Sequence, residues 1–209
     1  MPTDTKERIL DSAELLFSSQ GIANTSLRSL TEHAQVNLAA VNYHFQSKDA
    51  LVQAVLFRRV NPINQRRMDL LTALQAPTIE QILDAFYRPA VEAVLAGSEG
   101  RAVARLISRL YSEPGELLAS QVRALMSEIL RTFGEAIQRA LPSVPPGEIF
   151  LRLHFCIGIM AHTFGAMHLI EGMARGRFDY DDPEAILRQM ITFAAAGLRA
   201  EGESVCAAS

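Results

Sequence analysis

The segment 25–48 constrains the fold of this chain more than any other, because it holds two short helical patterns, a tight turn and a third helix start. Thr25 or Ser26 can open the first pattern, and Asn37 is suited to cap the second. The apolar positions of the first pattern are Leu27, Leu30 and Ala34, with Val36 at the corner that follows. Two short helices joined by a turn of about three or four residues predict a helix-turn-helix unit.

A further helix is predicted directly before this unit. Asp4 can cap it, and Glu7 is placed to complete a capping box. Hydrophobic residues recur at helical spacing and make one apolar stripe, which comprises Ile9, Leu10, Ala13, Leu16 and Phe17. Gly21 stands where a left-handed residue would end the helix. We therefore expect residues 1–49 to form a three-helix N-terminal domain.

The pattern after Asn37 has one apolar face and one face of small and polar residues. The apolar face is expected to fill the gap between the preceding helices and comprises Leu38, Val41 and Phe45. The opposite face comprises Ala39, Ala40, Asn42, Tyr43 and His44. Small alanines allow close approach to a groove floor, a methyl group can contact thymine, and Asn can pair bidentately with adenine. These residues predict that the segment 37–45 enters the major groove of DNA.

The predicted DNA contacts fall into two classes. Base edges are expected near Arg28, Asn37, Ala40, Asn42 and Tyr43, with Ala39 beside them. Phosphates are expected at Thr25, Ser26, Tyr43, His44 and Lys48. Ser47 can cap the next helix, and its positive N-terminus together with Lys48 makes a phosphate anchor.

These residues resemble the N-terminal domain of TetR-type transcriptional regulators. The resemblance covers roughly residues 5–58 and is carried by Thr-Ser-Leu-Arg from Thr25, by the run 36–45 and by Ser-Lys-Asp-Ala-Leu from Ser47. The run Tyr-His-Phe-x-x-Lys, residues 43–48, is its most specific part. Gln35 departs from the family, which often has glycine in the turn, so Gln35 has to accept that backbone geometry or shift the turn.

The resemblance implies an all-α protein in which a helical body follows the DNA-binding domain. In that family the body holds an effector pocket and a two-fold dimer interface, commonly a four-helix bundle of the last two helices. The stretch 145–155 also resembles, more loosely, members that respond to fatty acids or acyl thioesters. A small apolar or amphipathic effector is the ligand that this resemblance implies.

The charge distribution limits the affinity that the chain can have for nucleic acid of any sequence. The formal net charge of the 209 residues is -3. Residues 1–60 are balanced, with Lys6, Arg8, Arg28, Lys48, Arg58 and Arg59 against Asp4, Glu7, Asp11, Glu14, Glu32 and Asp49. Non-specific affinity for nucleic acid is therefore expected to be modest and strongly salt-dependent. This argues against a coating protein and favours a site-specific binder that relies on dimer geometry.

Cysteine usage and the hydropathy pattern favour a cytoplasmic protein. Cys156 and Cys206 give no disulfide framework and fit a reducing compartment. The N-terminus is polar and shows no signal peptide. The run 149–170 is long and apolar, but polar residues interrupt it at Arg152, His154, His162 and His168. We therefore expect a buried or dimer-forming helix there, and no membrane span.

The chain after the motif reads as one helix after another, with no strand-like alternation. Pro62 is expected to kink or restart the helix that begins at 48, and Pro89 is expected to bend a later one. Helices are predicted at 48–61 with a continuation to 74, then at 78–96, 101–112, 116–141, 148–174 and 183–201. Residues 50–201 are thus predicted to form an effector-binding and dimerisation domain, and residues 202–209 a flexible tail.

The predicted helix 148–174 is apolar on nearly every side, so it needs cover on every side. A monomer would have difficulty covering both this helix and the final one, and a homodimer is the natural solution. The residues expected in the dimer interface are Phe155, Ile159, Met167, Met190 and Phe193. The alternative is that these residues pack in the hydrophobic core of a single protomer.

Candidate effector contacts combine arginines with soft apolar residues. Arg105 and Arg109 are four residues apart on a predicted helix, near Tyr111, and could bind an anionic headgroup. The alternative is a solvated helix face with flexible arginines. An adaptable apolar pocket could be lined in part by His154, Met160 and Phe164. Packing in the core between helices would explain Met160 and Phe164 equally well.

The sequence carries no strong catalytic signature. His154, Cys156 and His162 invite a zinc hypothesis, but their spacing scatters them around a helix, and buried histidines are favoured instead. No nucleophile elbow or paired-carboxylate pattern is visible. No metal and no cofactor are expected.

The function that the sequence favours is a dimeric, ligand-responsive transcriptional regulator, a repressor that binds an inverted-repeat operator in double-stranded DNA. The first alternative is a helical binding or carrier protein whose N-terminal helices contact protein. The second is a small helical metalloenzyme that uses His154, Cys156 and His162.

Overall fold

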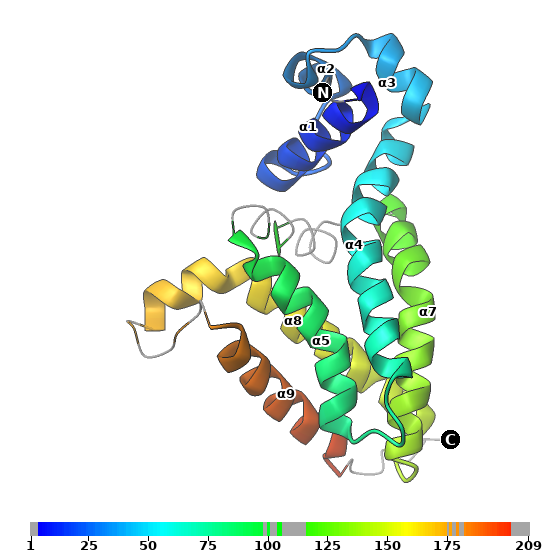
Figure 1. Cartoon of the computed structure of the whole chain (residues 1–209), viewed down its shortest axis with the longest axis vertical. Helices are drawn as coiled ribbons and strands as arrows, with labels where there is room; N and C mark the ends of the chain where they lie inside the picture. The colour runs from blue at the N-terminus through cyan, green and yellow to red at the C-terminus, as the bar shows by residue number, and fades with distance from the viewer. Residues whose placement is uncertain are drawn as a thin grey trace, which may run out of the picture.

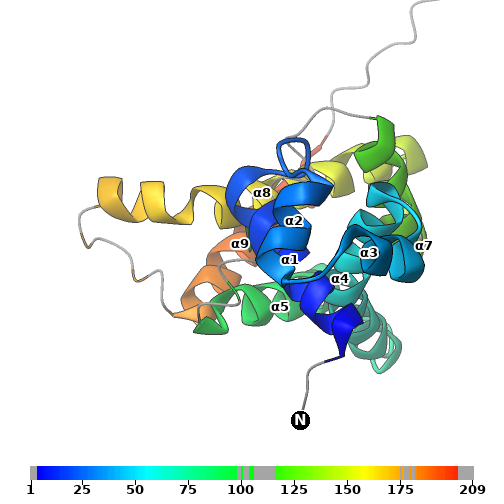
Figure 2. The ribbon, with the colours of Figure 1, turned by 90° about the horizontal axis from the view of Figure 1, so that it is seen from above.

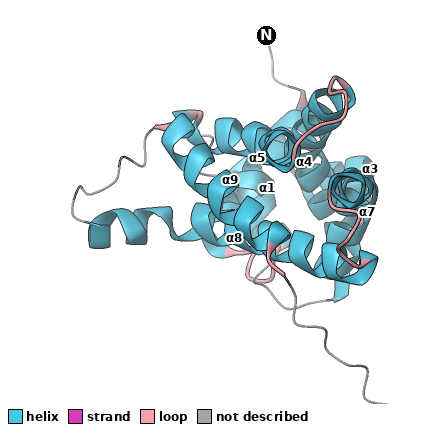
Figure 3. Ribbon diagram, turned by 90° about the horizontal axis from the view of Figure 1, so that it is seen from below, coloured by secondary structure: helices cyan, strands magenta, loops and turns pink. Residues whose placement is uncertain are grey.

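The computed structural model of the chain describes residues 4–97, 100, 104–105, 116–174, 176, 179 and 182–201. Within these ranges the backbone forms helices and loops, without a strand (Figure 3), which confirms the predicted all-α fold class. The helices are α1 (Thr5–Gln20), α2 (Leu27–Ala34), α3 (Leu38–Phe45), α4 (Lys48–Thr72), α5 (Ile79–Leu95), α7 (Glu116–Ala140), α8 (Pro146–Ala174) and α9 (Pro183–Arg199).

The short helices α1, α2 and α3 lie together at one end of the molecule (Figures 1 and 2). The long helix α4 starts beside α3 and runs down into the body, where it packs along α5 and α7. Helix α5 also packs against α9, and α8 contacts α7 and α9. Because α4 is one continuous helix, it joins the small N-terminal cluster directly to the larger body.

Two apolar cores correspond to these two parts. The N-terminal core takes residues from α1 to α3 and also from the first turns of α4, namely Leu51, Val52, Val55 and Leu56. The body core takes residues from the rest of α4 and from α5, α7, α8 and α9. Leu125 of α7 packs against both cores. We call α1–α3 with residues 48–56 the N-terminal unit, and the remainder the helical body. The predicted division between residues 49 and 50 stays a prediction, and this packing favours a boundary further along α4, after Leu56.

Pro62 was predicted to kink or restart the helix, and the restart is wrong, because α4 continues from Lys48 to Thr72 through Pro62. Pro62 lies on the exposed side of α4, and the buried stripe continues past it. A proline inside a helix removes one backbone hydrogen bond and crowds the carbonyl of the preceding turn. A long helix can accept this cost when the segments on both sides of the proline are packed in a core. Helix α5 likewise continues through Pro89.

An ion-pair network fastens α4 to α1. Arg58 donates to Glu7 at 3.1 Å, to Asp11 at 2.5 Å and to Glu14 at 3.3 Å. Arg59 donates to both oxygens of Glu14, at 2.7 and 2.8 Å. The Glu14 side chain is 7% exposed, so this carboxylate is held between two guanidinium groups close to the core. Asp4 caps α1 as predicted, but Glu7 pairs with Arg58 and the capping box is not observed.

A buried arginine crosses the body core, and the sequence analysis missed it. Arg67 is 2% exposed and donates to the Phe86 carbonyl at 2.7 Å and to Asn64 Oδ1 at 2.9 Å. Its guanidinium also lies 3.3 Å from Met160 Sδ and 4.4 Å from the centre of the Phe86 ring. We call this set the Arg67 network. The signal was available, because positions 60, 63, 64, 67 and 71 share one buried helical stripe.

Candidate DNA-binding site

The turn between α2 and α3 is fixed by backbone geometry and by a side chain from α1. Ser26 caps α2 by accepting from Ser29 N at 3.0 Å. Gln35 ends α2 in the left-handed conformation, with φ 52 and ψ 46, the geometry for which the family often uses glycine. Arg8 donates to the carbonyls of Ala34 at 2.6 Å and of Gln35 at 2.9 Å. This contact of Arg8, which the sequence analysis missed, ties α1 to the end of α2.

Helix α3 begins at a side-chain cap and buries only one edge. Asn37 accepts from Ala40 N at 2.8 Å through its carboxamide oxygen, which leaves its NH₂ group for other partners. Val41 and Phe45 are 1% and 5% exposed and anchor α3 in the N-terminal core. The outward side carries Ala39, Asn42 and Tyr43, the last 83% exposed.

Leu38 was predicted to belong to the buried edge, and this prediction is wrong because the side chain is 50% exposed. Leu38 shares the helical face of Val41 and Phe45, but it stands at the first position of α3, where the core covers it only in part. Ala40, in contrast, is half-buried against the N-terminal core. The start of α3 thus offers Leu38 as an additional exposed apolar group.

The junction between α3 and α4 is a very tight turn. Gln46 has φ 64 and ψ -37, and Ser47 N donates to the Phe45 carbonyl at 2.7 Å. Ser47 caps α4 by accepting from Ala50 N at 3.1 Å, as predicted. The half-buried Lys48 occupies the first position of α4, so its ammonium group and the helix N-terminus lie at the same end of the helix.

Two of the predicted DNA contacts are constrained by other partners. Thr25 is 1% exposed and donates to the Gly21 carbonyl at 2.7 Å, so its hydroxyl is unavailable to a phosphate, and that assignment is corrected. Arg28 is exposed and pairs with Glu32 at 3.0 Å. Such a surface pair contributes roughly 0–1 kcal/mol and leaves Arg28 available to DNA.

The other predicted contacts remain accessible in this fold. His44 is half-buried, with its ring centre 5.1 Å from that of Tyr43 in an edge arrangement. Ser26 and Asn37 are exposed at the starts of α2 and α3. The structure therefore gathers Ser26, Arg28, Asn37, Ala39, Asn42, Tyr43 and Lys48 in one unit built from α2, α3 and the start of α4.

The predicted effector residues are not brought together in the same way. Met160 and Phe164 are buried in the body core, whereas His154 and Arg105 are exposed. Arg109 and Tyr111 lie outside the described residues. The expectation that the histidines are buried is wrong for His154 and His162 in the single chain.

The zinc hypothesis fails on the same geometry. Cys156 is 3% exposed and faces the body core, while His154 and His162 face outward, so the three side chains do not converge. Burial raises the pKa of the Cys156 thiol, which keeps it protonated. Within the described residues, no cluster of three metal-ligating side chains is found.

The predicted dimer residues divide into exposed and buried groups. Phe155 on α8 and Phe193 on α9 are 56% and 71% exposed, and Ile159 is half-buried. Met190 is 5% exposed and packs inside the body core, so its assignment to an interface is corrected. For Met167 the structure describes the backbone and not the side chain.

Helix α8 has the length and composition of a membrane span over Pro146–Ala166, with a hydropathy of 1.4, and 44% of its most apolar window is buried inside the fold. The core helix of a water-exposed protein passes the same test, so this property is weak evidence for a membrane. Packing against α7 and α9 accounts for much of its apolar surface.

Comparison with known proteins identifies both parts of the chain. Residues 9–55 match the family described as bacterial regulatory proteins, tetR family, and residues 84–197 match the tetracyclin repressor-like, C-terminal domain. The probable HTH-type transcriptional regulator YttP of Bacillus subtilis is 38% identical over 53 residues, which are 25% of this chain and 26% of that protein. The HTH-type transcriptional repressor Rv3405c of Mycobacterium tuberculosis is 36% identical over 100 residues, 46% of this chain and 52% of that protein.

The chain thus spans between about a quarter and a half of the length of these curated relatives. Among solved structures, the fatty acid degradation regulator FadR from Bacillus halodurans superposes with a TM-score of 0.69, covering 96% of this chain and all of that one. The two sequences are 12% identical, so the likeness concerns the fold and not the effector. Because the second family match covers more than half of the chain and the first covers the helix-turn-helix, this chain belongs to the TetR family of bacterial regulatory proteins.

Proposed function

We propose that this chain is a dimeric, ligand-responsive transcriptional repressor that inserts α3 into the major groove of each half-site of an inverted-repeat operator. The observation that carries the proposal is the construction of α3. Val41 and Phe45 hold one edge in the core while Asn42 and Tyr43 project from the other. A short helix presented in this way has the shape and hydrogen-bonding groups to read base edges.

In this proposal, side chains on the outward face of α3 recognise the base sequence of the operator. Asn42 can pair bidentately with adenine, and the methyl groups of Ala39 and Leu38 can contact thymine. Arg28 at the start of α2 can reach a guanine edge once it releases Glu32. Phosphate contacts from Ser26, Tyr43, His44 and Lys48 would set the register, because such contacts position the protein without reading sequence.

A two-fold dimer would present two copies of α3 to successive half-sites. Phe155 and Phe193 are large apolar side chains left exposed on α8 and α9, and a second copy of the same surface would cover them. Half-sites one helical turn apart are separated by about 34 Å. A change in the angle between protomers therefore misplaces one α3. A small apolar or amphipathic effector would act by binding one arrangement more tightly than the other.

The base-reading role of Asn42 is tested by binding to the selected operator and to a scrambled duplex. Asn42→Ala is expected to cost about 1–3 kcal/mol on the operator and little on the scrambled duplex, because a bidentate base contact is lost. Lys48→Ala is expected to weaken binding to both duplexes and to reduce the salt slope by about one. Arg139→Ala, in the last turn of α7, removes a charge from the far end of the body and serves as the control.

Equal losses on both duplexes for Asn42→Ala would refute base readout by this residue. An unchanged salt slope for Lys48→Ala would refute its phosphate contact.

The dimer is tested by sedimentation equilibrium at micromolar concentration. Phe155→Glu is expected to shift the chain to monomer, because a charge in an apolar interface loses its hydration without gaining a partner. Phe57→Glu is the matched control, since Phe57 on α4 is 55% exposed but lies outside the predicted interface. A monomeric wild-type chain, or equal behaviour of the two variants, would contradict this surface assignment.

A further inference from the structure

The exposed face of α8 carries two imidazoles that the proposed function does not use. His154 and His162 are both exposed, and neither has a hydrogen-bond or ion-pair partner in the part of the chain that the structure describes. They are eight residues apart, which is roughly 12 Å along the helix, so one chain cannot bring both rings to the same ion. A metal site formed by this pair within a single chain is therefore excluded.

The two histidines belong to a row of exposed residues that has the spacing of a helix–helix contact. The row, which we call the α8 seam, comprises Leu151, Phe155, Gly158 and His162, at intervals of four, three and four residues. This alternation keeps one side of a helix against a neighbouring helix. Leu151 and Phe155 are 51% and 56% exposed, and the seam contains no charged residue. A second copy of the same surface is therefore a suitable cover for it.

Gly158 lies in the middle of the α8 seam, where a second α8 can approach most closely. It is exposed, and a Cβ atom added to it would meet no other atom within 4 Å. Leu151 stands seven residues before Gly158, and Gly165 stands seven residues after it. An antiparallel crossing of two α8 helices at Gly158 therefore sets the large Leu151 side chain against the partner's Gly165. Matching a large residue with a small one lets the helices pack closely.

The same crossing brings histidines of different chains together. In a two-fold contact the same surface serves both protomers, so residues equally far from an antiparallel crossing lie opposite each other. His154 is four residues before Gly158 and His162 is four residues after it, which places His154 opposite the partner's His162. The pair lies roughly 6 Å along the helix from the crossing. Packed helices are about 8–10 Å apart, which leaves room for two imidazoles and one ion.

We propose that His154 and the partner's His162 bind a zinc ion, in two equivalent sites of a dimer whose α8 helices cross antiparallel at Gly158. Neutral imidazole is a common zinc ligand, with a Zn–N distance of about 2.0–2.1 Å, and water completes the coordination. Each ion links the two protomers, so zinc strengthens the dimer. The site rests on the dimer of the proposed function and adds a metal to its interface.

The metal is tested by sedimentation at protein concentrations around the dimer dissociation constant, with zinc chloride, with magnesium chloride or with neither. Zinc is expected to lower the dissociation constant of the wild-type dimer about tenfold, because the ions bind the dimer and not the monomer. Magnesium is expected to leave it unchanged, since this ion prefers oxygen ligands. His154→Gln and His162→Gln are each expected to abolish the zinc effect, because either change removes one imidazole from both sites.

A mixture of the two variants tests whether the ligands come from different chains. A homodimer of either variant has no complete pair of imidazoles. A heterodimer of His154→Gln with His162→Gln has one complete pair, formed by the remaining histidine of each chain. Zinc is therefore expected to tighten dimerisation in the equimolar mixture and in neither variant alone. A mixture that does not respond, or a single variant that responds as the wild-type chain does, would overturn the pairing.

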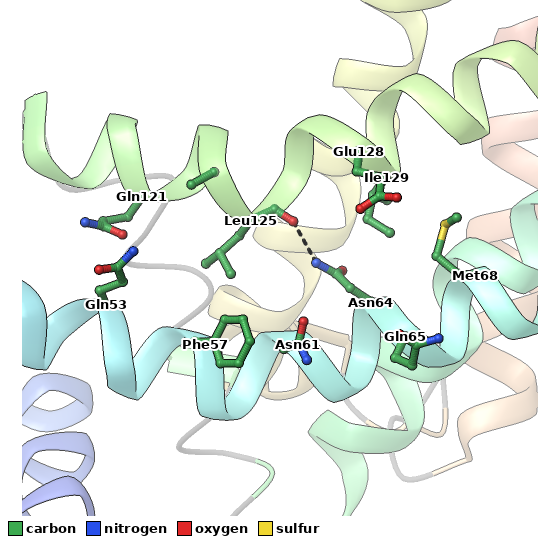
Figure 4. A pocket seen from close by; sticks show the side chains of 11 residues that line it. Gln53, Phe57, Asn61, Asn64, Gln65, Met68, Gln121, Leu125, Glu128 and Ile129 are labelled. Carbon is green, nitrogen blue, oxygen red and sulfur yellow. Dashed lines mark hydrogen bonds between the residues drawn. The ribbon is translucent and has the colours of Figure 1, made fainter.

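Two matched controls remove other groups that could bind zinc. His33→Gln removes an exposed imidazole from α2, where it contacts Ser12. Glu128→Gln removes the carboxylate of the groove between α4 and α7, in which Figure 4 shows Glu128 on α7. Both variants are expected to respond to zinc as the wild-type chain does. Loss of the response in either control would assign the ion to that place and overturn the site on α8.

The outcomes separate this site from the proposed function. A wild-type dimer that depends on Phe155 but does not respond to zinc would overturn the metal site and leave the dimeric repressor standing. A chain that stays monomeric with and without zinc would overturn the site together with the dimer. Failure to bind an operator, with the zinc response intact in the wild type and in the mixture, would overturn the proposed function alone.

Discussion

The two cores of this chain differ in how they treat polar groups. In the N-terminal core the buried hydroxyls of Ser18 and Thr25 bond to nearby carbonyls of the same segment, and Arg58 and Arg59 of α4 form their ion pairs with α1 at the rim. The body core instead encloses Arg67 together with the Tyr87 hydroxyl, which donates to the Cys156 carbonyl at 3.1 Å. Burial raises the pKa of Tyr87, so the hydroxyl stays protonated and keeps donating.

This difference in core construction indicates that the N-terminal unit and the helical body have different mechanical roles. A close-packed core whose buried hydroxyls bond locally and whose charges lie at the rim makes a rigid support, which suits a helix that has to meet a groove at a fixed angle. A core that contains a hydrogen-bonded cation holds its helices in one specific arrangement, and that arrangement depends on a few bonds. We therefore expect the proposed effector to act by shifting the helices of the body.

The largest effect is expected from breaking the Arg67 network. Arg67→Ala removes the donor to Phe86 and Asn64 and leaves a cavity, and it is expected to lower the free energy of unfolding by about 3–5 kcal/mol. Arg67→Met keeps most of the volume without the charge and is expected to lose clearly less. Urea denaturation followed by circular dichroism measures both. A Met variant as unstable as the Ala variant would show that the charge itself, and not the filled volume, holds the body.

A medium effect is expected at the rim of the N-terminal core. Glu14→Gln leaves Arg58 and Arg59 with a weaker acceptor and is expected to cost about 2 kcal/mol, because Glu14 is nearly buried. Glu32→Gln, which breaks the exposed pair with Arg28, is expected to stay within about 0.5 kcal/mol. Thermal unfolding of the two variants separates them. Similar losses would mean that burial does not distinguish these carboxylates.

The smallest effect is expected at a surface pair of the body. Arg199 of α9 donates to both oxygens of Glu80 on α5, at 2.5 and 2.8 Å, and this contact lowers the pKa of Glu80 to about 2. A lowered carboxyl pKa stabilises the fold above the ordinary value of 4.5, and that contribution is lost as pH falls towards 2. Because both side chains are nearly half exposed, Glu80→Gln is expected to cost below about 1 kcal/mol at neutral pH.

The difference in unfolding free energy between wild type and Glu80→Gln is therefore expected to be constant above pH 4.5 and to vanish near pH 2. A difference that grows on acidification would contradict the sign of this assignment.

Features that depend on a few neighbouring residues could be predicted from the sequence. The caps at Ser26, Asn37 and Ser47 are observed where the pattern places them, because a cap needs one side chain and the next turn of helix. The left-handed geometry of Gln35 follows from the shortness of the turn. The all-α class follows from repeated helical periodicity.

Features that depend on distant partners could not be predicted in this way. The contact of Arg8 with the end of α2 joins residues far apart in the sequence. Met190 and the outward histidines of α8 were misplaced because a nearly all-apolar pattern does not say which side of the helix faces the core. Helix α4 continues through Pro62 because packing on both sides of it outweighs the local penalty.

The central claim is that the outward face of α3 contacts DNA bases. The most direct measurement selects a duplex from a random pool with the wild-type chain, then photo-crosslinks it to Tyr43→p-benzoylphenylalanine and to Phe57→p-benzoylphenylalanine. Tyr43 is 83% exposed on α3, and Phe57 is 55% exposed on α4 away from that face. We expect an inverted repeat and a crosslink from position 43 alone. Failure to enrich any sequence, or equal crosslinks from both positions, would contradict the account.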